Sequence, residues 1–273
     1  MKLPVVGFLG GHGERSIKED NNRSYSAFVN YKSFRPALIN QGFDVEEVTL
    51  EKPLPAHIRI LVIADPLQKF TEEEQRNLEQ YIERGDNLVI ATEPKRRDIT
   101  SSLLERFGVK FVPGILANSG EYSNLTQSRP MIGVKDISEL YLLDGLRRWG
   151  AVVSMPDAVG LEYSKDAGFD VMPILETDTT GCWNELETID FGEGKAELHA
   201  EAGEKEQTYA LALALSRKVG EKEQRIFVMG DADCFSNGEF FMKRRGVNTE
   251  NQILPRYVFF WLSGGEYPID TTR

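Results

Sequence analysis

The sequence predicts an α/β fold with a doubly wound, mostly parallel sheet, and three observations lead to this prediction. Short apolar runs alternate with amphipathic stretches over residues 1–110, which is the pattern of βαβ units. The run at residues 58–64 is apolar almost throughout, as expected of a strand buried on both faces. The stretch that follows carries helix signals at both ends, because Thr71 and Glu74 can form a capping box and Gly85 can end the helix.

The remaining elements of residues 1–110 continue this alternation. Three further strands are predicted by compact apolar or alternating runs, at residues 5–9, 43–48 and 87–92. A helix is predicted at residues 25–41, although Pro36 inside it has no N–H to donate and should break or kink it. A short helix is predicted from residue 98 to Gly108. We expect the crossovers between parallel strands to be right-handed.

The second half of the chain is less regular. Residues 113–150 are rich in Gly, Ser, Asn and Pro, with only a short apolar stretch at 137–146, so we interpret them as an insertion. Further elements are strands at 152–155, 171–175 and 208–216, a buried strand from 225 that runs into an acidic turn at 230–233, and a helix at 251–262. The charged residues 192–207 predict a solvated loop or hairpin. We expect one domain over residues 1–273, with a core at 1–112 and 151–262.

One of these strands is ambiguous between two kinds of structure. Residues 209–215 alternate Ala and Leu after Tyr209. Alanine and leucine favour helix by intrinsic propensity. Strict alternation is the period of a strand, and it decides the prediction in favour of a strand.

Composition and charge exclude several classes of protein. The 273 residues include 32 Lys and Arg against 43 Asp and Glu, giving a net charge of −11, which argues against nucleic-acid binding. No run approaches the roughly 18 apolar residues of a membrane span, and the first residues do not resemble a signal peptide. Cys182 and Cys234 lie far apart, so neither a disulfide framework nor a zinc cluster is indicated.

Polar residues follow four of the predicted strands, at residues 10–15, 65–66, 92–94 and 230–237. Ligands of doubly wound sheets bind outside the carboxyl ends of the strands, so these clusters should converge on one edge. Gly10, Gly11 and Gly13 permit close backbone approach there. The predicted ligand- or partner-binding residues are His12, Gly13, Glu14, Glu93, Asp231, Asp233 and Asn237. An alternative is that these polar side chains only join neighbouring loops by hydrogen bonds.

The sequence lacks the patterns of several common nucleotide-binding and catalytic motifs. The glycines near residue 11 do not continue into G-x-G-x-x-G, because Ser16 takes the third position, and no phosphate-binding G-x-x-x-x-G-K-[ST] occurs. Cys234 lacks the flanking glycines of a nucleophile elbow, so we predict a packed small hydrophobe. His57 and His199 lie away from His12, whereas zinc enzymes usually need about three protein ligands. We therefore predict no catalytic residue, no metal and no cofactor.

Three segments together resemble a known family. The first is residues 6–14. The second is residues 65–66 followed by 70–74 and 78–82. The third is residues 228–233 with 236–237 and 261–262. This set is similar to the soluble domain of GldG-like, gliding-motility-type ABC transporter auxiliary proteins. The resemblance implies a fold related to class I glutamine amidotransferases (flavodoxin-like) and to intraflagellar-transport proteins, without a catalytic nucleophile. It also implies an extracytoplasmic domain that works with an ABC permease and an ATPase.

From the resemblance we expect a non-catalytic accessory domain of a bacterial ABC-type transport system, on the periplasmic face of the inner membrane. Transmembrane segments that this chain lacks would tether it, so we expect an excised portion of a longer protein. Its ligand would be a carbohydrate or another small molecule.

Two alternatives from other classes stay open. One is a metal-assisted hydrolase that holds a divalent ion with His12, Asp231 and Asp233. The other is a carbohydrate-binding module, for which Trp183, Tyr122 and Tyr163 are the candidate stacking platforms.

Overall fold

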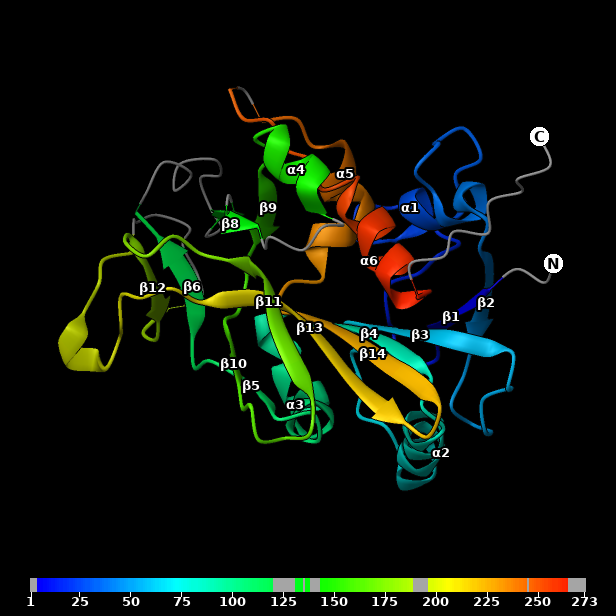
Figure 1. The fold of residues 1–273 in the computed structure, drawn as a ribbon. Helices are drawn as coiled ribbons and strands as arrows, with labels where there is room; N and C mark the ends of the chain where they lie inside the picture. Colours follow the sequence, from blue (N-terminus) through cyan, green and yellow to red (C-terminus); the bar gives the residue numbers. More distant parts are fainter. Residues whose placement is uncertain are drawn as a thin grey trace.

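The computed structural model describes residues 4–119, 131–134, 136–137, 143–188, 196–244 and 246–264. Its main sheet has the order β2-β1-β3-β4-β14-β13-β10-β5 (Figure 1). The first five of these strands run parallel to their neighbours: β2 (Asp44–Val48), β1 (Val5–Leu9), β3 (Ile58–Ala64), β4 (Asn87–Ala91) and β14 (Lys222–Met229). This is the 2-1-3-4-5 order of flavodoxin-like folds. The predicted doubly wound, mostly parallel α/β core is confirmed.

The order of these strands fixes where the sheet changes direction. From β1 the chain moves to β2 on one side and then returns to β3 on the other side. The switch point therefore lies between β1 and β3, where two consecutive crossovers depart in opposite directions. In open α/β sheets, ligands bind outside the carboxyl ends of the strands at such a point.

The sheet continues beyond β14 with antiparallel strands. They are β13 (Ala210–Val219), β10 (Leu161–Tyr163), β5 (Val109–Phe111), β11 (Asp170–Glu176) and β8 (Asp136–Ile137). The alternation of residues 209–215 thus forms a strand, as predicted. Successive side chains of a strand point to opposite faces of the sheet. Ala212 and Ala214 therefore pack in the core on one face, and Leu213 and Leu215 pack in the core on the other.

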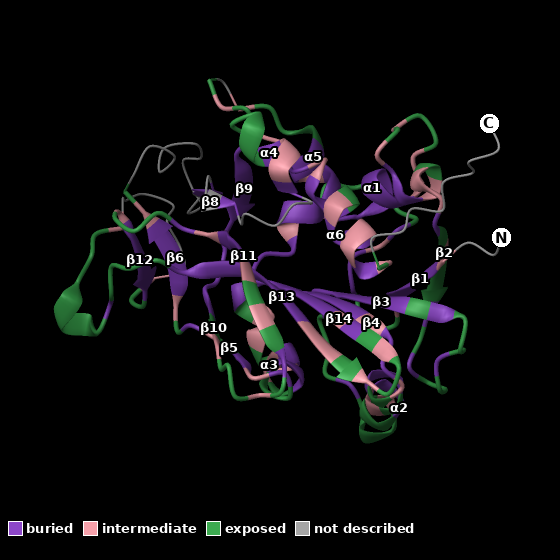
Figure 2. Cartoon of the chain, viewed as in Figure 1, coloured by how far each residue is buried: buried purple, intermediate pink, exposed green. Residues whose placement is uncertain are grey.

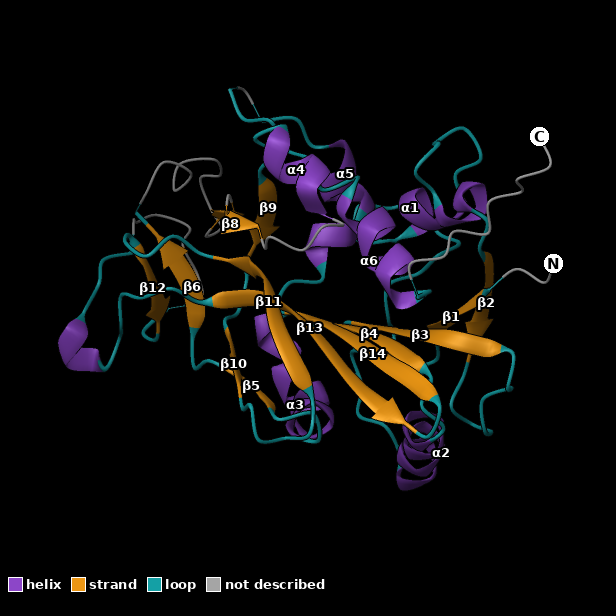
Figure 3. Cartoon of the chain, in the orientation of Figure 1, coloured by secondary structure: helices purple, strands orange, loops and turns teal. Residues whose placement is uncertain are grey.

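Helices cover both faces of the sheet (Figure 3). One face packs against α2 (Glu72–Glu83) and α3 (Arg97–Glu105), which bury Leu78, Tyr81 and Leu104. The other face packs against α1 (Ser26–Asn30), α5 (Asn237–Phe241) and α6 (Leu254–Leu262), which bury Phe28, Phe240 and Phe259. Figure 2 shows the central strands buried between these two layers.

The ends of α2 follow the predicted signals. The Thr71 hydroxyl accepts from the backbone N–H of Glu74 at 3.3 Å, and the Glu74 carboxylate accepts from the N–H of Thr71 at 2.8 Å. This capping box satisfies amides that the first helical turn leaves unpaired. Gly85 follows the last turn with a φ of +76°, a conformation that glycine adopts without steric cost.

The predicted helix at residues 25–41 is wrong in extent. The α-helical part is limited to α1, and a short 3₁₀ helix follows at Leu38–Gln41. The prolyl ring at residue 36 fixes φ and removes a donor, which explains why no continuous helix forms. The last predicted strand ends at Met229, and the acidic segment 230–233 follows it outside the sheet, as predicted.

Strands from the predicted insertion pair with strands that come later in the chain. β6 (Ile115–Asn118) pairs with β12 (Cys182–Glu185), and β7 (Met131–Val134) pairs with β9 (Val153–Pro156). A short helix, α4 (Asp144–Arg148), precedes β9. Residues 120–130 and 138–142 lie outside the described residues, and so does part of the predicted charged loop, at residues 189–195. Within the described ranges, none of the helices has the length and apolar character needed to cross a bilayer.

Gly230 provides a sharp test of the backbone packing at the end of β14. Its N–H donates to Leu211 O at 2.9 Å, and its carbonyl accepts from Val159 N at 2.8 Å. A Cβ on residue 230 would lie 2.0 Å from the carbonyl oxygen of Val159, so the backbone has to move. We expect Gly230→Ala to lower the free energy of unfolding by about 1–3 kcal/mol in urea titrations.

The matched control is Gly10→Ala after β1, where an added Cβ meets nothing within 4 Å. We expect it to change the free energy of unfolding by less than about 0.5 kcal/mol. Similar losses in the two variants would contradict the packing seen at Gly230.

Candidate functional site

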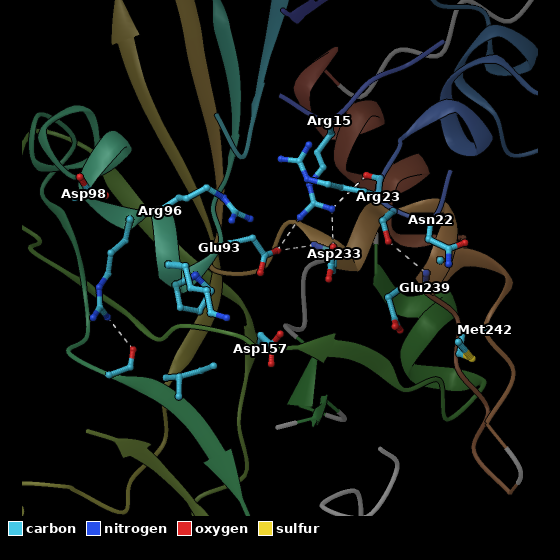
Figure 4. Close-up of a pocket in the computed structure, with 17 residues that line it drawn as sticks. Arg15, Asn22, Arg23, Glu93, Arg96, Asp98, Asp157, Asp233, Glu239 and Met242 are labelled. Atoms are coloured by element: carbon cyan, nitrogen blue, oxygen red, sulfur yellow. Dashed lines mark hydrogen bonds and ion pairs between the residues drawn. The ribbon is translucent and has the colours of Figure 1, made fainter. Parts of the chain in front are cut away.

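A cavity of about 750 Å³ opens at the carboxyl ends of the parallel strands (Figure 4). One wall is formed by residues that follow three of these strands, with Arg15 after β1, Glu93 after β4 and Asp233 after β14. The opposite wall includes Gly114 and Asp157 from the segments around β6 and β9. The cavity lies at the sheet edge where doubly wound proteins bind ligands.

Arg15 is the hub of the site. Its side chain is only 2% exposed, and its guanidinium nitrogens contact three carboxylates. They lie 2.6 Å from Asp233 Oδ1, 3.1 Å from Glu93 Oε1 and 2.9 Å from Asp65 Oδ2. A buried guanidinium is tolerated only when it is paired and hydrogen-bonded, so these contacts join the ends of β1, β3, β4 and β14.

Asp65 is the carboxylate that the arginines share. Besides Arg15, it binds Arg96 through Nε at 2.5 Å and Nη2 at 2.6 Å, and Arg23 through Nη2 at 2.9 Å. Its side chain is fully buried, and its backbone has a φ of +53°. Asp157, in the opposite wall, is the other non-glycine residue with positive φ among the described residues. Such strained positions cluster at functional sites.

Glu93 connects β4 to the turn after β14. Its carboxylate accepts from the backbone N–H groups of Ala232 and Asp233, both at 3.0 Å, as well as from Arg15. Burial raises the pKa of Glu93 to about 7, and the negative charge of Asp233 adds to this effect, while Arg15 opposes it. The wall of the cavity therefore contains a carboxyl group that exchanges its proton near neutral pH.

Asp231 has a structural position in the turn after β14. Its Oδ1 accepts from the N–H groups of Asp233 at 2.7 Å and Cys234 at 3.2 Å, which shapes the turn. Cys234 is fully buried, as predicted for a packed small hydrophobe, and burial raises its pKa well above the ordinary value. Burial also raises the pKa of Cys182 to about 12.

His12, Gly13 and Glu14 hold the loop after β1 in place. The His12 ring lies 3.2 Å from Glu74 through Nε2 and 3.4 Å from Glu14 through Nδ1, and it contacts the edge of Phe70. The carbonyl of His12 accepts from Leu67 N at 2.7 Å. Gly13 adopts a φ of +75° against the Leu67 side chain. These contacts fasten the loop to the β3–α2 connection, outside the lining of the cavity.

Asn237, the first residue of α5, joins this helix by hydrogen bonds to the start of α1 and to the segment before α1. Its Oδ1 accepts from Ala27 N at 2.9 Å, and its Nδ2 donates to Asn21 O at 3.0 Å and Ser26 Oγ at 2.9 Å. Its side chain is buried and does not line the cavity.

The four predicted polar clusters thus meet at one edge of the sheet, but they divide into two groups. Glu93 and Asp233 line the cavity, whereas the other five predicted residues hold the surrounding loops. The prediction missed the arginine–aspartate network formed by Arg15, Arg23, Asp65 and Arg96. One feature of the sequence could have indicated the network, namely a charged residue directly after a buried strand, as at Asp65. The sequence does not show which charges pair, because that depends on how the loops fold against each other.

The residues proposed for a metal site do not form one. His12 faces two glutamates, Asp231 binds backbone amides, and Asp233 binds Arg15. In the described part of the chain, the group of acidic, histidine or cysteine side chains close enough to share an ion is Glu185, Glu187 and Glu204. That group lies beside β12 and away from the cavity lining.

Of the aromatic residues proposed for sugar stacking, the two that the structure describes, Trp183 and Tyr163, do not line the cavity. Trp183 is buried against Ile115 and Ala117. Tyr163 is half-buried against the core, and Tyr122 lies outside the described residues. The structure therefore gives the stacking hypothesis no accessible platform at Trp183.

The strand order and the polar cavity define the class of protein: an α/β domain of flavodoxin-like topology with a ligand-type cavity at its carboxyl edge. Sequence comparison is more specific. Residues 3–129 match the family described as ABC-type uncharacterized transport system. The predicted resemblance to ABC transporter auxiliary proteins is thereby confirmed over these residues, which make up less than half of the chain. No curated protein matches the chain significantly in sequence.

Solved structures share the fold. The N-terminal domain of mmIFT52 superposes with a TM-score of 0.61 at 13% identity, covering 97% of this chain and 100% of that domain. This agrees with the predicted likeness to intraflagellar-transport proteins in fold. A ThuA-like protein from Parabacteroides merdae is more distant, with a TM-score of 0.44 at 10% identity, covering 99% of this chain and 93% of that one.

Asp65→Asn tests whether the shared carboxylate holds the site together. Asparagine keeps the size of the side chain and tolerates the left-handed backbone, so the substitution removes mainly the charge. Because buried Arg15 loses one of its counter-charges, we expect a loss of about 3–5 kcal/mol in the free energy of unfolding, measured by urea denaturation. The control Asp98→Asn, in an exposed pair with Lys69, should cost less than about 1 kcal/mol. Equal losses would refute the central role of Asp65.

Glu93→Gln tests the titration of the buried carboxyl. The folded-state pKa is above the unfolded value, so the folded state binds more protons, and stability falls as pH rises through the interval up to about 7. The slope for one proton is at most about 1.4 kcal/mol per pH unit. We expect the stability of Glu93→Gln relative to the unmodified protein to increase from pH 5 to pH 8 in urea titrations.

Glu83→Gln, on the exposed face of α2, is the control for this measurement. Its stability relative to the unmodified protein should stay constant across the same range. A constant difference for Glu93→Gln as well would show that Glu93 does not titrate there.

Proposed function

We propose that the chain is a non-catalytic accessory domain of a bacterial ABC-type transport system that binds a ligand or partner at the strand-end cavity. The observation that carries the proposal is the cavity itself, with a wall of paired arginines and carboxylates held by buried Arg15. The match of residues 3–129 to an ABC-type transport family supplies the biological setting. Of the predicted residues, Glu93 and Asp233 are the ones that face the ligand in this proposal.

The chemistry of the cavity supports binding rather than catalysis. Covalent catalysis needs a nucleophile within reach of a base, and histidine is the commonest base. None of the three histidines, which all lie in described parts of the chain, lines the cavity. The hydroxyl that does line it, on Ser236, accepts from the N–H of Glu239 at 3.4 Å as the N-cap of α5. Both cysteines are buried with raised pKa values, the opposite of a reactive thiolate.

The proposed partners are the permease and ATPase subunits of the transporter. We place the domain on the periplasmic face of the inner membrane, tethered by segments outside this chain. Support for a protein contact comes from two exposed apolar side chains beside the cavity, Phe241 and Met242, which are 54% and 48% exposed. Met242 lines the cavity, and Phe241 stacks on Tyr31 with ring centroids 6.3 Å apart. Exposed apolar groups beside a polar site often mark a protein interface.

Affinity purification of the full-length gene product from detergent-solubilised membranes tests this proposal. We expect a permease and an ATPase to co-purify and to be identified by mass spectrometry. The double substitution Phe241→Ser with Met242→Ser should reduce their recovery several-fold, because it removes the apolar contact.

Met172→Ser is the matched control, since Met172 is 44% exposed on β11. Its recovery of both subunits should equal that of the unmodified protein. Recovery of the unmodified protein from the soluble fraction alone, without either subunit, would refute the accessory role.

A further inference from the structure

The lining of the cavity contains equal numbers of cationic and acidic side chains in a protein that is acidic as a whole. The chain has a net charge of −11, yet the cavity lining contains five cationic side chains: Arg15, Arg23, Lys95, Arg96 and Arg97. Carboxylates also line it, at Glu93, Asp98, Asp157, Asp233 and Glu239. What a ligand meets therefore depends on which of these charges are already compensated within the protein.

Most of the carboxylates have cations of their own. Glu239 forms a two-pronged pair with Arg244, at 2.8 and 2.9 Å, and Asp98 lies 3.4 Å from Lys69. Neither Arg244 nor Lys69 belongs to the lining, so these two acids are compensated from outside the cavity. Glu93 and Asp233 are bound by Arg15, and the raised pKa of Glu93 reduces its negative charge at neutral pH further.

Two cationic side chains of the lining, Lys95 and Arg97, differ from the others in their partners. Arg97 donates to the carbonyl oxygens of Gly114 at 2.8 Å and Val112 at 3.3 Å, which carry no net charge. Lys95 is exposed at the mouth. Among the described residues, no carboxylate forms an ion pair with either side chain. Lys95 precedes α3 and Arg97 is its first residue, so both lie near the positive end of the helix dipole.

Arg15 offers a separate observation, a hydrogen-bond donor that has no partner within the protein. Its Nε–H is buried and has no hydrogen-bond partner, although both of its terminal nitrogens are paired. Leaving a buried donor unsatisfied is costly, and native proteins rarely do so. Arg15 lines the cavity, so a ligand oxygen seated there can supply the acceptor once the side chain shifts to bring the buried Nε to the surface.

We infer that the cavity binds a small organic anion, whose carboxylate or phosphate group lies between Lys95, Arg97 and the first turn of α3. The polar remainder of the ligand extends toward Arg15. This inference rests on the proposed function, since it names the ligand class of the same cavity. Both carboxylate and phosphate match the charge and the hydrogen-bond donors present.

Thermal unfolding with added anions tests the inference. The probes are glycerol 3-phosphate, succinate and inorganic phosphate, each compared with sodium chloride of equal ionic strength and with uncharged glycerol. We expect at least one anion to raise the Tm in a saturable way, as ligand binding to the folded state requires. Lys95→Glu should weaken its apparent affinity at least ten-fold. Lys218→Glu, an exposed lysine on β13, should leave the affinity unchanged.

Each contrary outcome is informative. No saturable stabilisation by any probe, an equal effect of glycerol, or equal affinities for Lys95→Glu and the unmodified protein would overturn the anion site. Because partner recovery is measured separately, an intact complex with no anion binding overturns only this inference. Anion binding without any transporter subunit refutes the accessory role instead.

A final arm separates a free anion from a lipid headgroup. The purified protein is sedimented with vesicles of phosphatidylglycerol and with vesicles of phosphatidylcholine. Lys95-dependent binding to the anionic vesicles assigns the site to a lipid phosphate. Saturation by a soluble anion, with no vesicle binding, assigns it to a soluble metabolite.

Discussion

The buried guanidinium of Arg15 is the interaction on which the carboxyl edge of the sheet depends. Four parallel strands end close together there, and loops leave them in different directions. A charged group in this position is stable only if carboxylates surround it, and they come from three other strand ends: Asp65, Glu93 and Asp233. The loops are therefore fixed by a shared electrostatic requirement. Because Asp65 serves three arginines, this network has little tolerance for the loss of one negative charge.

The same network explains why the cavity exists. One wall is made of charged side chains that form ion pairs with one another, so the strand ends do not close into an apolar contact. The opposite wall includes residues beside β6 and β9, which pair with β12 and β7 rather than with the parallel core. A polar hollow between two separately supported walls is a suitable place for a ligand.

The sequence was informative where local rules act alone. The capping box at Thr71, the apolar run of β3 and the Ala–Leu alternation of β13 each encode their element directly. The convergence of the strand-end clusters also followed from the predicted topology. It could not be foreseen that Asn237 would clamp α1 or that Arg15 would become the hub, since those roles depend on which loops fold against each other. The helix expected at 25–41 failed for a local reason, the proline at position 36.

The position of β14 in the sheet has a consequence for how the chain is made. β14 is the neighbour of β4, with Ile226 opposite Leu88, although about half of the chain lies between them. A polypeptide emerging from the ribosome therefore completes four strands of the core long before the fifth is available. Throughout that time β4 presents an open apolar edge, which is a template for unwanted pairing. Such long-range closure also slows folding. Efficient production of the protein thus depends on shielding the edge of β4 until synthesis has passed residue 229.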